Sequence, residues 1–389
     1  MDFSYPAEVE RFREELRAWL RENLTDEVVA AGRARRRDGG ALDLLRAWDA
    51  TMADAGRGAV SWPREYGGRG ATVLEQMAYA EETTRARAPI PLNVIGLNNI
   101  GPGIMTYGTD AQKRELLPRM VRADDIWCQG MSEPEAGSDL ASLRTRAVQS
   151  SGPDGDDFVV NGQKIWTSLG DRADWCQLYV RTDVDAPKHQ GISCLIVDMT
   201  LPGIDVRPLV NLNGNADFAE VFFNDVRVPA ANLLGSLNGG WQVATTTLSH
   251  ERAGAARLYA GLQLQLADLV ADLAGHTFDG RPVLEDGATL RRLGELAVQV
   301  DYLELLCKRS ISAELHGGDA LGSAALAKSV WAEVGQAMAN LAFDVTGPRQ
   351  AADRWTEQRL SSRSLTIAGG TTQISKNITA VRVLGLPRR

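Results

Sequence analysis

The stretch GMSEPEAGSDLAS, at residues 130–142, stands where the pattern of the chain changes from helical to strand-like. By itself it indicates the end of a strand that runs into a loop rich in hydroxyls and small residues. Such a loop can offer backbone N–H groups and serine hydroxyls to an electron-rich ligand edge. The plainer interpretation is an ordinary turn capped by serine and aspartate, and the segment alone favours that interpretation.

Upstream of this stretch the pattern is helical. Apolar residues recur on one helix face at Phe12, Leu16 and Leu20, so residues 7–24 predict an amphipathic helix. Similar patterns continue at about 41–55, 73–86, 97–107 and 110–122. We therefore expect an N-terminal α-helical domain over residues 1–125.

Downstream, from residue 126 to about 235, short runs of β-branched and apolar residues alternate with turn residues. Phe158-Val159-Val160 is followed by Asn161-Gly162, a pair that favours a hairpin because both positions tolerate positive φ. Repeated short strands of this kind are typical of a compact barrel or sandwich. We expect residues 126–235 to form a middle β-barrel domain.

The rest of the chain returns to helical patterns, now in long segments. They lie at about 240–274, 288–316, 321–346 and 371–384. Four long helices with brief connections indicate a bundle, so we expect residues 236–389 to form a C-terminal four-helix bundle. The predicted fold class is therefore α+β and multidomain, in the order α, β, α.

Composition excludes several classes of protein. The chain has 389 residues and a net charge of −8, which argues against general nucleic-acid binding. No apolar run is long enough to insert into a membrane as a spanning helix. The four cysteines lie far apart without metal-ligand spacing, so neither a disulfide framework nor a metal site is expected. The acidic N-terminus lacks the features of a targeting segment, and we expect a cytoplasmic protein.

A second motif, NGQKIWTS, occupies residues 161–168. A tryptophan that follows a hairpin in a strand is usually a core residue. Trp166, however, stands next to two hydroxyl residues in a domain that already has a polar loop. In that setting the indole can instead stack on an aromatic cofactor.

Together these segments resemble the acyl-CoA dehydrogenase family of flavoenzymes. The first stretch matches the family's first signature, and the second matches its flavin-stacking strand. Further matches are GGW at residues 239–241, AGGTTQI at 368–374 and VLGLP at 383–387. The resemblance spans essentially the whole chain and includes the α, β, α order of its domains.

The resemblance implies an FAD cofactor and an acyl-CoA substrate. It also implies which residues contact them. The implied roles are hydrogen bonds to the flavin ring from Met131 and Ser132, stacking by Trp166, donation to the hydride-accepting nitrogen by Ser168, contact with the CoA pantetheine by Ser138, and FAD contacts by Thr371 and Gln373. Of these, Gln373 would reach FAD across a subunit interface.

The reaction needs a base, because the α-proton of a thioester is only weakly acidic. Many family members carry the carboxylate immediately before a Gly-Thr pair, where this chain has Gly369. A second branch has a glutamate in the first long helix of the C-terminal domain, and Glu251 matches that position. The resemblance thus implies Glu251 as base, Arg252 as the residue that orients or tunes the site, and a Gly369 N–H in the oxyanion hole. A Glu-Arg pair in a helix is otherwise more often a solvated surface pair.

Two features of the family's FAD site are degraded in the C-terminal half. An expected Arg-x-x-Phe-Gly segment is replaced by HTFDGRP at residues 276–282, and an expected Gln-x-x-Gly-Gly-x-Gly segment by NLAFDVTGP at 340–348. Sequence drift can explain this, because phosphate contacts are made by interchangeable donors. A partner chain that supplies the missing contacts is the other explanation. The expected assembly is a homodimer or homotetramer, with a heterotetramer containing a second acyl-CoA dehydrogenase-like chain as the alternative.

The function that the resemblance implies is dehydrogenation of an acyl-CoA to the trans-2-enoyl-CoA, with electrons passed to an electron-transfer flavoprotein. Two alternatives stay open. One is a catalytically weak partner subunit of a heteromeric acyl-CoA dehydrogenase, which the degraded motifs favour. The other is a flavin oxidase or monooxygenase on the same scaffold, since one fold hosts several chemistries.

Overall fold

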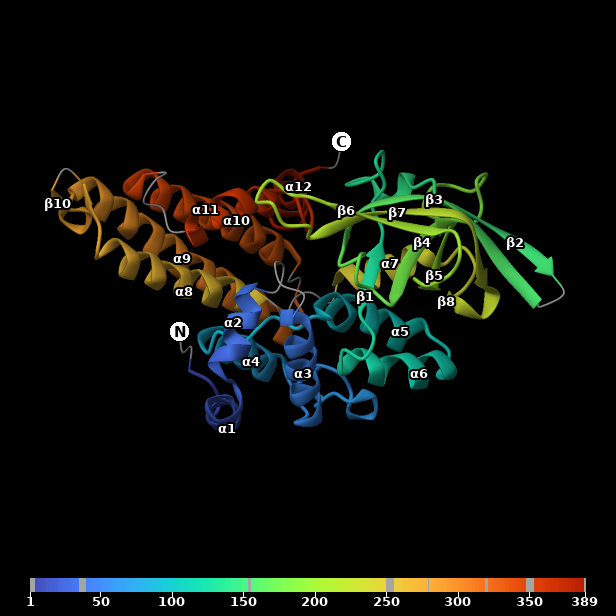
Figure 1. Cartoon of the computed structure of the whole chain (residues 1–389), viewed down its shortest axis with the longest axis horizontal. Coiled ribbons are helices and arrows are strands. Elements are labelled where there is room, and N and C mark those ends of the chain that lie inside the picture. The colour runs from blue at the N-terminus through green and yellow to red at the C-terminus, as the bar shows by residue number, and fades with distance from the viewer. Residues whose placement is uncertain are drawn as a thin grey trace. The chain divides into compact units, whose positions relative to one another are not determined.

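The computed structural model describes residues 4–34, 40–152, 155–249, 255–278, 280–318, 321–347 and 353–387. The chain divides into two compact units. The first comprises Met1–Leu24, Thr72–Ala88 and Arg252–Arg389, and the second comprises Thr25–Ala71 and Pro89–Glu251. Figure 1 labels the elements of both units. The N-terminal helical region therefore contributes helices to each of them.

The described part of the first unit is almost entirely helical. Its helices are α1 (Ala7–Asn23), α4 (Val73–Arg85), α8 (Ala255–Leu273), α9 (Gly287–Leu315), α10 (Leu321–Thr346), α11 (Asp353–Ser361) and α12 (Thr372–Arg382). A short hairpin of β9 (Thr277–Phe278) and β10 (Arg281–Pro282) joins α8 to α9. At the start of α4, Thr72 and Glu75 form a reciprocal capping box, which satisfies backbone N–H groups that the helix leaves unpaired.

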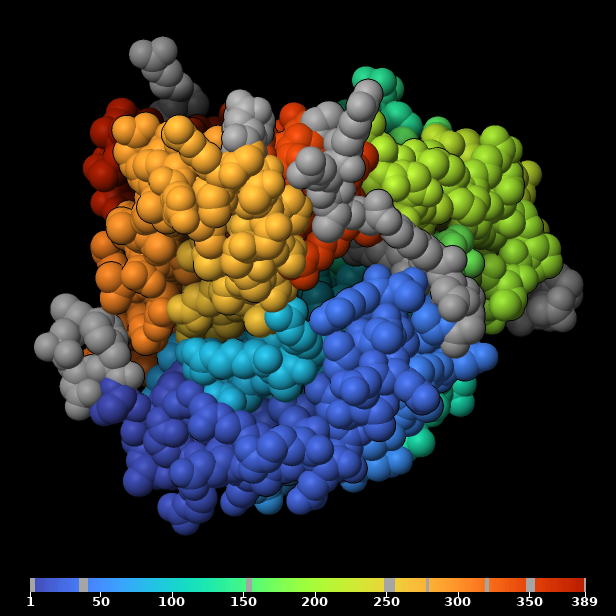
Figure 2. Space-filling model, turned by 60° about the vertical axis from the view of Figure 1, so that its left-hand side comes forward, coloured from blue at the N-terminus to red at the C-terminus, as the bar shows by residue number. Residues whose placement is uncertain are grey.

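The long helices of this unit share one apolar core. In that core lie Met77 of α4, Tyr259 of α8, Leu303 of α9 and Met338 of α10. The helices α8, α9 and α10 contact one another, and α12 contacts α10. Figure 2 shows the residues of α8 and α9 as one continuous layer of surface. The helical C-terminal region predicted from the sequence is therefore present, although residues 250–254 of the predicted helix 240–274 lie outside the described ranges.

Apart from short 3-10 turns, the described residues of the second unit combine a sheet with five α-helices and one π-helical turn. These are α2 (Asp26–Ala34), α3 (Gly40–Asp54), a π-helical turn (Gly96–Ile100), α5 (Gly101–Tyr107), α6 (Asp110–Val121) and α7 (Gly240–Ser249). The predicted helix over 97–107 is thus π-helical in its first half. No helix in the described ranges has the length and apolar character needed to cross a membrane.

The sheet of the second unit has eight strands. They are β1 (Trp127–Gly130), β2 (Arg146–Gly152), β3 (Gly155–Ser168), β4 (Trp175–Arg181), β5 (Ile192–Asp198), β6 (Ile204–Leu209), β7 (Phe218–Pro229) and β8 (Leu233–Leu234). Their order is β6-β7-β3-β2-β4-β5-β8, and β1 adds to the sheet as a parallel neighbour of β4. Figure 1 shows the long antiparallel strands β3 and β7 side by side.

The prediction of a middle β-barrel is not confirmed, because the described sheet is not closed. Within the described strands the order runs from β6 to β8, and these two ends do not pair with each other. The sheet curves enough for β5 and β7 to touch, and their side chains share a core that includes Val197 and Val221. However, β6 carries Pro208 and an exposed ion pair between Asp205 and Arg207 at 2.7 Å. Proline and exposed charges are typical of an edge strand, where they discourage pairing with a further strand on the open side.

The predicted hairpin at Asn161-Gly162 is wrong, because the strand β3 runs through both residues. The register with β7 shifts between Val160 and Gly162, and the extra residue of this bulge lies on β7, where Asn224 and Asp225 stand opposite Asn161. Gly162 has a φ of 152°, and a Cβ there would lie 2.6 Å from the Thr145 Cα. Asn161 bonds across the sheet, donating from Nδ2 to Asp225 Oδ1 at 2.9 Å. The hairpin between β2 and β3 lies instead beyond the pair Gly152 and Gly155.

Candidate functional site

The loop that follows β1 is held against β3 by three contacts. Lys164 Nζ donates to the Met131 carbonyl oxygen at 3.1 Å and to Glu133 Oε1 at 2.9 Å. The Ile165 N–H donates to the Ser132 carbonyl oxygen at 2.9 Å. The two motifs recognised in the sequence are therefore neighbouring parts of one structure.

Lys164 and Glu133 form a buried ion pair, in which the Lys164 side chain is 0% exposed. Burial lowers the pKa of Lys164, and the nearby Glu133 charge offsets only part of that effect. Burial also opposes ionisation of Glu133, but Lys164 and hydrogen bonds from the backbone outweigh it and lower the Glu133 pKa. Those bonds come from the N–H groups of Arg144 and Thr145, at 2.6 and 2.8 Å. The pair thus joins the loop to β3 and to the residues that precede β2.

Trp166 lies in an irregular stretch of β3. The register with β7 shifts between Lys164 and Thr167, and Trp166 has a φ of 60°. The bulge leaves the indole 57% exposed, and its ring meets the Phe218 ring edge-on with centroids 5.9 Å apart. An exposed indole that is supported by a second ring is suited to stacking on a planar ligand.

Hydroxyl groups lie on both motifs. Among the described residues, the hydroxyls of Ser132 and Ser168 have no hydrogen-bond partner, and the Thr167 hydroxyl is buried without one. Free donors beside an open aromatic face fit the edge and face of the flavin ring of FAD. Met131, Ser132, Trp166 and Ser168 are therefore residues that can hold the flavin.

Ser138 lies further along the same loop and is exposed. Its neighbour Asp139 accepts a hydrogen bond from Lys188 Nζ at 2.9 Å and one from Ser142 Oγ at 2.5 Å. These contacts lower the pKa of Asp139, with the Ser142 bond as the largest cause. Ser138 is thus open to solvent on an anchored loop, and its contact with a pantetheine chain stays a prediction.

The C-terminal motif lies in the first unit, at the start of α12. The Thr371 hydroxyl caps this helix by accepting from the Ile374 N–H at 3.1 Å. Gly369 and Gly370 have φ values of 64° and 93°, which favour glycine. Gln373 is exposed. Thr371 therefore has a structural task, while the ligand contacts of Gly369, Thr371 and Gln373 stay predictions.

The predicted base lies in a stretch that the structure does not describe. The helix α7 ends at Ser249, and α8 begins at Ala255. Glu251 and Arg252 lie outside the described residues, so their catalytic roles stay predictions.

The role of Lys164 and Glu133 was missed in the sequence, although both stand inside the quoted motifs. The alternation of side chains along β3 indicates that Lys164 is buried, because it stands an even number of residues after Phe158 and Val160 and so shares their face of the strand. All three side chains are buried. A lysine on the buried face of a strand needs a buried acid. The first motif supplies one in Glu133.

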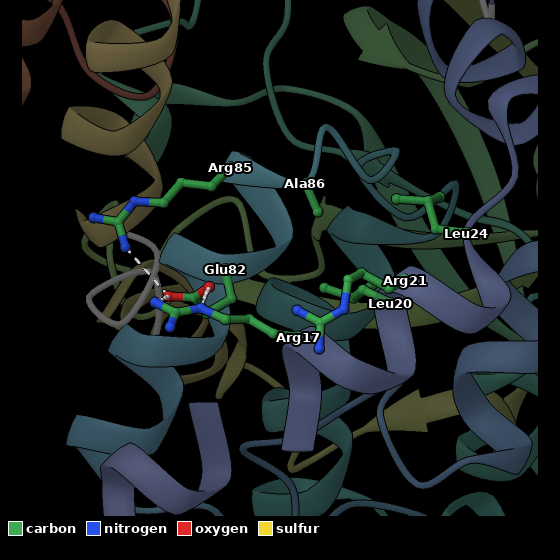
Figure 3. A pocket seen from close by; sticks show the side chains of 7 residues that line it. All are labelled: Arg17, Leu20, Arg21, Leu24, Glu82, Arg85 and Ala86. Carbon is green, nitrogen blue, oxygen red and sulfur yellow. Dashed lines mark hydrogen bonds and ion pairs between the residues drawn. The ribbon is translucent and has the colours of Figure 1, made fainter. Parts of the chain in front are cut away.

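A hollow in the first unit is lined by none of these residues. It is lined by Arg17, Leu20, Arg21, Leu24, Glu82, Arg85 and Ala86, and Figure 3 shows Arg17 and Arg85 reaching toward Glu82. Burial opposes ionisation of Glu82, but hydrogen bonds from Arg17 and Arg13 outweigh it and lower the Glu82 pKa. This arginine cluster joins α1 to α4 and contains none of the predicted ligand-binding residues.

Comparison with known protein families gives consistent matches along the chain. The middle domain of acyl-CoA dehydrogenase matches residues 128–226, its C-terminal domain matches 238–384, and its N-terminal domain matches 6–124. Among curated proteins, the acyl-CoA dehydrogenase IpdE1 of Mycobacterium tuberculosis is 38% identical over 98% of both chains. The acyl-CoA dehydrogenase FadE26 of the same organism is 36% identical over 100% of this chain and 99% of its own.

Solved structures agree with these matches. A chain of the ChsE4-ChsE5 complex from Mycobacterium tuberculosis is 33% identical and superposes with a TM-score of 0.86, covering 100% of both chains. A chain of the Tcur3481-Tcur3483 steroid ACAD is 31% identical, again with a TM-score of 0.86 and full coverage of both chains.

Proposed function

Because the chain belongs to the acyl-CoA dehydrogenase family and is an FAD-dependent oxidoreductase of that class, we propose that it converts an acyl-CoA to the trans-2-enoyl-CoA. FAD, when bound, supplies the acceptor for the hydrogen that leaves Cβ as hydride. The observation that carries this proposal is the joined pair of motifs, in which Lys164 holds the loop after β1 against the strand of Trp166.

The residues of the second unit bind and orient the flavin in this proposal. Trp166 stacks on the ring, and the hydroxyls of Ser132 and Ser168 donate to its edge. Support comes from the exposed indole and from the unpartnered hydroxyls among the described residues. Met131 contacts the ring through its backbone N–H, because its carbonyl oxygen already accepts a hydrogen bond from Lys164. Ser138 contacts the pantetheine, and Thr371 and Gln373 contact FAD.

Glu251 takes the α-proton at its carboxylate, and Arg252 orients that carboxylate. The match of Glu251 to the base position of the family's second branch supports this assignment, as does the absence of a carboxylate at Gly369. The Gly369 N–H donates to the thioester oxygen, where negative charge develops as the proton leaves.

The test of this function is the visible absorption of the purified flavoprotein during anaerobic addition of acyl-CoAs. We expect the flavin band to bleach with a substrate, and Glu251→Gln to bind FAD and acyl-CoA but to abolish bleaching. Bleaching at the wild-type rate in the variant would remove Glu251 as base. Rapid return of colour on exposure to air would instead favour the oxidase alternative.

We further propose that the chain works with a second acyl-CoA dehydrogenase-like chain on a ring-containing acyl group. Support comes from the degraded segments at 276–282 and 340–348 and from the two similar structures, one described as a ChsE4-ChsE5 complex and the other as a Tcur3481-Tcur3483 steroid ACAD. Electrons would pass to an electron-transfer flavoprotein. A cytoplasmic location is supported by the four cysteines, all unpaired and buried.

Mass and flavin content measured together test this assembly. A homotetramer of the chain alone with one FAD per subunit would contradict the two-chain proposal. A colourless chain that gains FAD only with a second chain would support it.

A further inference from the structure

One peptide group of the loop after β1 has a cation on one side and an open donor on the other. The carbonyl oxygen of Met131 accepts a hydrogen bond from the Lys164 ammonium at 3.1 Å. The same peptide group ends in the N–H of Ser132. Among the described residues neither this N–H nor the Ser132 hydroxyl has a hydrogen-bond partner. A planar trans peptide points its C=O and its N–H in opposite directions, so the Ser132 N–H points away from Lys164.

The loop is fixed in this orientation by β3. The next carbonyl oxygen, that of Ser132, accepts from the Ile165 N–H at 2.9 Å. Two successive carbonyl groups of the loop are thus held by two successive residues of β3. Ile165 is followed directly by Trp166, whose indole is exposed. The open donors of Ser132 therefore belong to the same short stretch of structure as the ring face that we assign to the flavin.

The ammonium that holds this peptide is completely buried. A cation on a carbonyl oxygen polarises the peptide group and makes its N–H a stronger donor. Water and salt screen the charge only weakly, because the Lys164 side chain is 0% exposed. The Ser132 N–H is therefore suited to a ligand atom on which negative charge develops.

The carboxylate of Glu133 does not cancel the charge of Lys164 by itself. A second buried cation, Arg181, lies near that carboxylate, and its guanidinium donates to backbone carbonyl oxygens. Burial lowers the Arg181 pKa, and the charges of Glu133 and Asp183 offset part of that effect. Glu133 thus faces two buried cations, and positive potential remains at the peptide that Lys164 holds.

We propose that Lys164 is a positioning residue that acts through the peptide between Met131 and Ser132 to favour the reduced form of the bound flavin. A hydride brings two electrons and one proton, so the ring that accepts it gains one negative charge. A donor polarised by a buried cation stabilises this added charge more than it stabilises the neutral oxidised ring. The inference rests on the proposed function and deepens it, because it names the residue that sets how readily the flavin takes the hydride.

The test is the midpoint potential of the flavin in the complete, FAD-loaded enzyme without acyl-CoA, measured anaerobically against a reference dye of known potential. In Lys164→Met we expect the equilibrium between reduced and oxidised flavin to shift about 10-fold toward the oxidised form, the scale of one weakly screened charge nearby. For a two-electron couple this lowers the potential by about 30 mV. In the double variant with Glu133→Gln the unpaired carboxylate is removed as well, and the potential should return about halfway to the wild-type value.

The double variant separates charge from shape, because a loss of loop structure would move its potential at least as far from the wild type as that of the single variant. The matched control is Lys188→Met, which removes a cation from the exposed pair with Asp139 of the same loop. Solvent screens that pair, so the potential should stay unchanged. If Lys164→Met retains too little FAD for titration, Lys164→Gln takes its place with the same expected shift.

An unchanged potential in the Lys164 variant would refute the inference. A double variant whose potential is no higher than that of the single variant would also refute it, and so would an equal shift in Lys188→Met. If no acyl-CoA bleaches the flavin, the proposed function fails, and the potentials still decide the inference.

Discussion

The buried pair of Lys164 and Glu133 leads to a prediction about both stability and flavin binding. The substitution Lys164→Met keeps an apolar stem of similar length and removes the ammonium group. Removing one member of a buried ion pair typically costs about 3–5 kcal/mol, because the other charge is left uncompensated. Glu133 keeps its two backbone N–H donors, at 2.6 and 2.8 Å, so we expect the lower end of that range.

Flavin affinity should fall together with stability. Lys164 Nζ also holds the Met131 carbonyl oxygen, at 3.1 Å. Without this donor the loop has to be ordered when FAD binds, and we expect the dissociation constant of FAD to rise about 10-fold, which is about 1.4 kcal/mol. Urea unfolding of the FAD-free chain gives the free energy of unfolding, and quenching of flavin fluorescence gives the affinity.

Lys188→Met is the matched control, because Lys188 also pairs with a carboxylate of this loop. Its bond to Asp139 is equally short, at 2.9 Å, but the side chains are 51% and 59% exposed. Such exposed pairs contribute about 0–1 kcal/mol. The double variant of Lys164→Met with Glu133→Gln should be more stable than the additive expectation by about 1–2 kcal/mol, since no uncompensated charge remains. Equal effects of the two lysine substitutions, or strict additivity in the double variant, would refute the reasoning.

Three further predictions concern the same sheet. Gly162→Ala should lower the free energy of unfolding by about 2 kcal/mol, because its Cβ would lie 2.6 Å from the Thr145 Cα. The control Gly137→Ala should change it little, because no atom lies within 4 Å of the added Cβ. Urea unfolding of both variants measures the difference. The stability that ionised Glu133 contributes should be present above its ordinary pKa of 4.5 and lost as the pH falls through its lower pKa in the folded protein. The free energy of unfolding of Glu133→Gln should therefore depend less steeply on pH in acid than that of the wild type. Parallel curves for the two proteins would contradict this. Trp166→Ala should leave the urea midpoint nearly unchanged, because the indole is 57% exposed, yet weaken FAD binding at least 10-fold by fluorescence titration; unchanged FAD affinity would remove Trp166 from the flavin site.

Helices with a long apolar face were predictable from the sequence, whereas short ones were not. The predicted helices over 110–122 and 321–346 correspond closely to α6 and α10. In contrast, α11 has nine residues, and Trp355 is its one buried residue among those described there. Too few apolar positions are present in such a helix to produce a periodic signal.

Long-range contacts explain the errors within the sheet. An Asn-Gly pair is the same in sequence whether it forms a turn or continues a strand. At Gly162 the outcome depends on the approach of Thr145, a neighbour supplied by the chain segment before β2. Likewise, the burial of Lys164 on β3 was readable from alternation, but its pairing with Glu133 requires that β1 end beside that strand. The motifs could thus be found in the sequence, and the bonds that join them could not.

The anchoring of the loop after β1 has a consequence for how the protein matures. The loop takes its shape only when β3 is in place, and β3 is paired with β7, which lies far along the chain. Contacts between distant segments form later than local helices. A chain in which β3 and β7 have not yet paired would therefore have most of its helical content but would bind no FAD and be colourless. Flavin absorption would then indicate that the sheet has formed and the protein is native. A circular dichroism spectrum dominated by helices would not distinguish this state from the incomplete one.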